Sequence, residues 1–214
     1  MGLCARAVVF KRQLEGFDIN ENGTFVIRDW RGASGFHWEQ MHADAVRGVA
    51  DKEGIVCPVT WNDWPESARG IFKGFRSEKG EDLVLQRNMF VEAVLPSSVI
   101  RDLSEEEMDH YRRAFSRPDD RQPTLNWPRQ IPIDNEPAHM VKLVDSYGQW
   151  MLGNTSLPKL FINANPGSIL TGKAREFCRS WPNQTEVTVA GLHFIQEDSP
   201  NEIGSAVAQW LGTI

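Results

Sequence analysis

The stretch that decides the fold reads FVIRDWRGASGFHW, residues 25–38. Residues 25–28 favour a β-strand, and an Asp–Trp pair then leads into small residues and a segment typical of a helix. An aspartate at a strand-to-helix turn can simply cap the helix. It can also be a nucleophile, because such a turn lifts a side chain clear of the sheet and points backbone N–H groups at it. Asp29 is therefore the first candidate for a catalytic residue.

The two ends of the chain alternate between strand-like and helix-like patterns. The expected strands cover residues 24–28, 46–56, 159–164 and 185–191, and the expected helices cover residues 33–43 and 172–180. A last helix follows Ser199, which can form a capping box with Glu202 while Pro200 fits the first turn. This alternation predicts an α/β protein with a mostly parallel sheet covered by helices.

The middle of the chain, residues 61–157, shows little strand pattern. Helices are expected over residues 64–76, 104–115 and 137–153, and Ser104 with Glu107 forms a second capping box. Prolines indicate a loop stretch between the last two of these helices; they are Pro118, Pro123, Pro128 and Pro132. We therefore expect a helical cap at 58–157, inserted between two parts of one core at 1–57 and 158–214.

The composition limits the possible functions. The chain has 214 residues, 41% of them hydrophobic, and a formal net charge of −6. Such a chain can bury a real core, and its acidic balance argues against nucleic acid or an anionic membrane as a partner. The three cysteines are odd in number and widely spaced, so they indicate neither a disulfide framework nor a metal site. The start of the sequence shows no membrane span and no clear cleavage region for export, so we expect a cytoplasmic protein.

Two further polar residues stand where predicted strands end. Glu53 comes just before Gly54 after the second strand, and His193 lies between the last strand and the last helix. Each residue alone would fit an ordinary turn or loop position. Because the carboxyl ends of parallel strands meet at one edge, the set of Asp29, Glu53 and His193 predicts a nucleophile, an acid and a base at that edge.

Longer segments resemble the haloalkane dehalogenases, a family of α/β-hydrolases, and their relatives the coelenterazine-using luciferases of sea pansies. The matching segments lie within residues 24–214 and read RDWRGASGFHW, WNDWPESARGIF, NMFVEAVLP, MDHYRRAF, PTLNWPRQIPI and GLHFIQEDSPNEIGS. The resemblance implies an α/β-hydrolase fold with a helical cap between sheet strands. It also implies that the chain lacks the first strands of that fold, and with them an asparagine that is the family's second halide ligand.

The resemblance implies roles for individual residues. Asp29 resembles the nucleophile that forms a covalent ester, His193 the base that activates water, and Glu53 the carboxylate that orients His193. Trp30 resembles a halide ligand, since an indole N–H is a donor without a competing lone pair. Cap residues that resemble the family's substrate pocket are Trp64, Phe90, Phe115 and Leu125.

Some family members carry the triad's acid after a later strand. At that place this chain has Asn163 and Asn165 rather than a carboxylate. The resemblance therefore leaves Glu53 as the candidate for this role.

The activity implied is hydrolysis of a small halogenated hydrocarbon by water, giving an alcohol and a halide ion, in a monomer without metal or organic cofactor. Three alternatives stay open. The first is oxidation of coelenterazine, and the second is an inactive, incomplete hydrolase. The third is epoxide hydrolysis, which needs paired cap tyrosines; the segments around Tyr111 and Tyr147 do not match that pattern.

Overall fold

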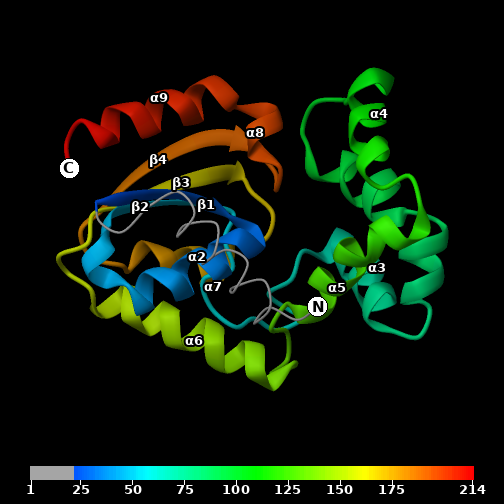
Figure 1. Ribbon diagram of the computed structural model, residues 1–214, viewed down its shortest axis with the longest axis horizontal. Helices are drawn as coiled ribbons and strands as arrows, with labels where there is room; N and C mark the ends of the chain where they lie inside the picture. The colour runs from blue at the N-terminus through cyan, green and yellow to red at the C-terminus, as the bar shows by residue number, and fades with distance from the viewer. Residues whose placement is uncertain (1–21) are drawn as a thin grey trace.

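The computed structural model describes residues 22–214, apart from the side chain of Arg31. Within this range the strands form one parallel sheet in the order β1-β2-β3-β4 (Figure 1). Their bounds are β1 (Gly23–Arg28), β2 (Val46–Lys52), β3 (Lys159–Pro166) and β4 (Gln184–Gly191). The predicted parallel sheet is confirmed. The expectations for the start of the chain fall on residues 1–21 and lie outside the described residues.

Helices cover both faces of the sheet (Figure 1). One face carries α2 (Asp29–Met41), α6 (Ala138–Gly153) and α7 (Gly172–Arg179), and the other carries α8 (Ile195–Asp198) and α9 (Pro200–Leu211). Successive strand residues point to opposite faces, so each face has its own core. In β2, for example, Val49 belongs to the core on the α2 side and Ala50 to the core on the α9 side.

The turn from β1 into α2 is tight. Helix α2 begins at Asp29 rather than at residue 33, because the chain enters the helix directly at the end of the strand. The helix then lies very close to the strand: a Cβ atom on Gly35 would be 3.0 Å from Cγ2 of Ile27. A glycine at this position allows the close contact that holds the turn against the sheet.

Strand β2 ends earlier than predicted. It stops at Lys52 instead of residue 56, because the next residue, Glu53, adopts a φ of 46° and leaves the extended region. The change of direction places Glu53 at the carboxyl edge of the sheet, beside the end of β1.

The segment expected to form the cap is mainly helical. Besides α6 it contains α3 (Glu66–Arg76), α4 (Glu105–Ala114) and α5 (Gln122–Gln130), with short helical turns at 82–86, 90–94, 96–98 and 118–121. Helices α3, α4 and α5 lie to one side of the sheet, whereas α6 runs beneath it (Figure 1). Helix α6 packs on α2, with the rings of Phe36 and Tyr147 5.3 Å apart. The division of the chain at residues 57 and 157 stays a prediction.

The prediction of a loop around the prolines of the helical cap is partly wrong, because two of them lie in α5. Pro123 lies in the first turn of α5, where its missing N–H costs no helical hydrogen bond. Pro128 lies inside the same helix, near its end. The apolar packing of this helix outweighs the local cost of the second proline, since Leu125 and Pro128 are both buried.

The two predicted helix caps have different outcomes. The capping box at α4 is confirmed, with the Glu107 N–H donating to the Ser104 hydroxyl at 3.2 Å and the Ser104 N–H donating to the Glu107 carboxylate at 2.8 Å. The expected cap at Ser199 is wrong. Its hydroxyl is buried and donates instead to the carbonyl of Ala190 at 2.7 Å, tying α9 to β4.

Charged residues are buried at the end of β2. Asp51 is 3% exposed and Lys52 is 8% exposed, and as consecutive strand residues they point to opposite faces of the sheet.

Among residues 22–214, every helix is too short or too polar to cross a membrane.

Candidate active site

Asp29 stands at the junction between β1 and α2, in a left-handed conformation with a φ of 48°. This conformation is unfavourable for a residue with a side chain and is typically kept at functional turns. Burial favours the neutral acid, but the contact and charge of His193, with smaller effects from Arg28 and the Trp30 backbone, lower the pKa of Asp29. Asp29 is therefore ionised at neutral pH, as a nucleophilic carboxylate must be.

The imidazole of His193 lies between two carboxylates. Its Nε2 atom is 3.7 Å from Oδ2 of Asp29, and its Nδ1 atom is 3.4 Å from Oε2 of Glu53. Burial alone would lower the pKa of His193, but the contacts and charges of Asp29 and Glu53 outweigh it and raise the pKa to about 9. The three residues from separate strand ends thus lie together at one edge of the sheet.

Glu53 is held by backbone donors from another loop. It is 1% exposed, and its carboxylate accepts the Ile169 N–H at 2.8 Å and the Ser168 N–H at 3.3 Å. These bonds fix the carboxylate on the side of His193 that faces away from Asp29. Sequence reasoning missed Ser168 and Ile169, because a backbone N–H leaves no signal in the residue type.

A cavity of about 510 Å³, including the space at its open mouth, lies over Asp29 and His193. Its walls come mostly from apolar residues of the cap, among them Trp64, Phe72 and Phe90. Two of the four expected pocket residues, Trp64 and Phe90, therefore line the cavity above Asp29.

The other two expected pocket residues lie elsewhere. Phe115 packs against the small cluster of Val91, Leu95 and Met108, and Leu125 is 2% exposed within the main core. Neither lines the cavity above Asp29. Their assignment to a substrate pocket stays a prediction that the geometry does not support.

Two indole groups of the cavity wall differ in their hydrogen bonding. The Nε1–H of Trp30 donates to the backbone carbonyl of Trp127 in α5 at 3.1 Å. The Nε1 atom of Trp64 is buried and has no hydrogen-bond partner among the described residues. A buried donor without an acceptor is costly, so the Trp64 N–H is suited to donate a hydrogen bond to an anion or to a polar ligand group.

The described part of the chain holds no group of three or more His, Cys, Asp or Glu residues that could bind a metal ion. The groups at this edge that can react or bind are two carboxylates, an imidazole and indoles. An ionised acid, a histidine and a second acid on separate strand ends define the site of an α/β-hydrolase.

Known proteins support this class. No family model matches the chain. A haloalkane dehalogenase of Sphingobium indicum strain UT26 is 52% identical over 198 residues, which are 92% of this chain and 67% of that protein. The coelenterazine h 2-monooxygenase of Renilla reniformis is 35% identical over 190 residues, 87% of this chain and 60% of that protein.

Solved structures agree with the sequence comparison. Haloalkane dehalogenase DbeA from Bradyrhizobium elkani USDA94 matches with a TM-score of 0.92 at 34% identity, covering 98% of this chain and 73% of that chain. The α/β-hydrolase fold expected from the sequence is confirmed. The chain belongs to the haloalkane dehalogenase family, and it spans about two thirds of the length of the dehalogenase from Sphingobium indicum.

Proposed function

We propose that this chain's site hydrolyses carbon–halogen bonds of small haloalkanes, with Asp29 as nucleophile, His193 as base and Glu53 as the carboxylate that supports the base. The observation that carries the proposal is the placement of His193 between Asp29 and Glu53 beneath an apolar cavity. The apolar wall of the cavity suits a small halogenated hydrocarbon, and the ionised Asp29 at the bottom of the cavity suits attack on carbon.

The first step needs no base. The carboxylate of Asp29 attacks the carbon that carries the halogen, a C–O bond forms, and the C–X bond breaks with its electron pair leaving on the halide. The product is an alkyl ester on Asp29 and a halide ion. The leaving anion is stabilised by indole N–H groups of the wall. Trp64 offers an N–H that has no acceptor among residues 22–214, whereas Trp30 must first release the carbonyl of Trp127.

The second step depends on a change in charge. While Asp29 is ionised, it helps to raise the pKa of His193 to about 9, so the imidazole is protonated. Esterification removes the negative charge of Asp29, which lowers the pKa of His193 and allows the imidazole to lose its proton. His193 can then take a proton from water, and the hydroxide attacks the ester carbonyl carbon. The alcohol leaves, Asp29 is restored, and one proton is released per turnover.

Relatives of both kinds match the chain, but the dehalogenase is the better supported of the two. The Sphingobium dehalogenase is 52% identical, compared with 35% for the Renilla monooxygenase. Oxidation of coelenterazine is therefore the second candidate, and light emission without halide release would favour it.

Bromide release from 1-bromohexane tests the proposal. We expect the wild-type chain to release bromide and the Asp29→Ala variant to release none above the rate in buffer. Equal release by the wild-type and Asp29→Ala proteins, both shown to be folded by circular dichroism, would show that Asp29 is not the nucleophile.

A further inference from the structure

The loop that carries His193 is bound to the segment that leads into cap helix α4. The backbone N–H groups of His193 and Phe194 both donate to the carbonyl of Ser98, each at 3.1 Å. In the opposite direction, the N–H groups of Ile100 and Arg101 donate to the carboxylate of Asp198 at 2.9 Å and 3.2 Å. Backbone donors of each segment thus bond to acceptors of the other.

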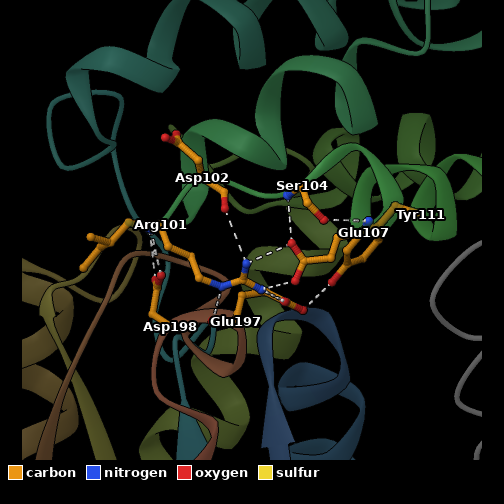
Figure 2. Close-up of polar contacts among 8 residues, drawn as sticks. Arg101, Asp102, Ser104, Glu107, Tyr111, Glu197 and Asp198 are labelled. Carbon is orange, nitrogen blue, oxygen red and sulfur yellow. Dashed lines mark hydrogen bonds and ion pairs between the residues drawn. The ribbon is translucent and has the colours of Figure 1, made fainter.

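The side chain of Arg101 extends this connection to α4, as Figure 2 shows. Its guanidinium donates to the Glu197 carbonyl at 2.8 Å and to the Glu197 carboxylate at 3.1 Å. The same guanidinium makes a two-pronged contact with Glu107 of α4, at 2.8 Å and 3.0 Å. Because a guanidinium is planar and rigid, it fixes the relative position of Glu107 and Glu197.

A second side chain of α4 reaches the same carboxylate. The hydroxyl of Tyr111 donates to Glu197, and this contact is partly buried (Figure 2). The Glu197 carboxylate therefore accepts hydrogen bonds from Tyr111 of α4 and from Arg101 in the segment before α4. Since Glu197 follows His193 by only four residues, and Ile195 between them is fully buried, the loop and α8 are fixed together.

These contacts are better suited to fixing position than to adding stability. Arg101 and Glu107 are each 40% exposed, and ion pairs with that exposure contribute little to the free energy of unfolding. The imidazole of His193, however, stands at 3.7 Å and 3.4 Å from its two carboxylates, distances that a small shift of the loop would change. Misplacing a reacting group by about 1 Å can cost a factor of about 100 in rate.

We infer that Tyr111 and Arg101 are positioning residues for His193. Through Glu197 and Asp198 they hold the histidine loop against cap helix α4, and so fix the imidazole between Asp29 and Glu53. The inference rests on the proposed function for its effect on turnover, although the position of the imidazole can be measured without any substrate.

Two charge-conserving variants test this role. Tyr111→Phe removes only the hydroxyl, and Arg101→Lys keeps the positive charge but loses the two-pronged geometry. The matched control is Arg117→Lys, which alters an exposed ion pair with Asp120 that is separate from the His193 loop. In rapid-mixing experiments with 1-bromohexane, we expect Tyr111→Phe and Arg101→Lys to slow hydrolysis of the Asp29 ester by about 10-fold, with the rate of ester formation nearly unchanged. The control should match the wild-type protein in both steps.

NMR titration of the His193 ring gives a readout that does not depend on substrate. Moving the imidazole away from its two carboxylates reduces their effect, so the pKa of His193 should fall from about 9 in the wild-type protein by about half a unit or more in Tyr111→Phe. A wild-type pKa in both variants would overturn the inference. If the wild-type chain forms no ester at all, the proposed function fails, and the titration still decides the positioning role.

Discussion

The indole N–H of Trp30 donates to the backbone carbonyl of Trp127 at 3.1 Å, so cap helix α5 accepts the hydrogen bond of the donor that follows Asp29 in the chain. A second indole of the cavity wall, that of Trp64, has a buried N–H without a partner among the described residues. A halide that enters the cavity can bond to Trp64 directly, but must displace a carbonyl to reach Trp30.

The first prediction concerns this difference. Replacing Trp64 by phenylalanine removes the free donor and keeps an aromatic ring, so we expect the dissociation constant for bromide to rise about tenfold, the range of a hydrogen bond to a charged group. Isothermal titration calorimetry with sodium bromide measures it. Trp150→Phe, on α6 and outside the cavity wall, is the control. Unchanged bromide affinity in Trp64→Phe would exclude this indole as the halide donor.

The second prediction concerns the charge coupling between the two proposed steps. Asp29→Asn imitates the neutral ester, so it should lower the pKa of His193 from about 9 by roughly one unit or more. The ring signals of His193, assigned by their loss in His193→Gln, can be titrated by NMR. Asp44→Asn, at an exposed position, should leave the titration unchanged. A pKa that stays near 9 in Asp29→Asn would mean that esterification does not free the base.

The third prediction concerns Asp51, whose carboxylate oxygens have no hydrogen-bond partner among the described residues. Burial, followed by the charge of Glu53, raises the pKa of Asp51 from 3.8 to about 8. Between these values the folded chain keeps the proton and the unfolded chain loses it. The contribution of Asp51 to the free energy of unfolding therefore falls as pH rises, by up to about 1.4 kcal/mol per pH unit.

Asp51→Asn removes this dependence. Relative to the wild-type protein, the melting temperature of the variant should gain more at about pH 8 than at about pH 5. Thermal unfolding followed by circular dichroism at the two pH values measures the difference, with the exposed Asp44→Asn as the control. An equal effect at both pH values would show that Asp51 is not a protonated acid in the folded chain.

The positions of the three candidate catalytic residues could be predicted because they depend on local sequence pattern. Asp29, Glu53 and His193 each follow a strand, and parallel strands bring their carboxyl ends to the same edge. The pattern of strands and helices was sufficient for this, although it misplaced the start of α2 and the end of β2. Both errors arise where a residue adopts a positive φ, which no propensity reveals.

The remaining features depend on tertiary contacts. Ser199 has the right residue type for a cap, yet its hydroxyl bonds to Ala190 of a neighbouring strand. Phe90 and Phe115 are both aromatic cap residues, and only the packing of the helices decides that Phe90 lines the cavity. The backbone N–H groups of Ser168 and Ile169 that hold Glu53 could belong to any residue type except proline.

The most direct test of the central claim is the intact mass of the His193→Ala protein after incubation with 1-bromohexane. Without the base, Asp29 should still attack carbon, but the ester should not be hydrolysed. We predict a gain of one hexyl group, mapped to Asp29 by peptide mass spectrometry. Folded, monodisperse His193→Ala protein that gains no hexyl group would contradict the claim that Asp29 is the nucleophile of a haloalkane-hydrolysing site.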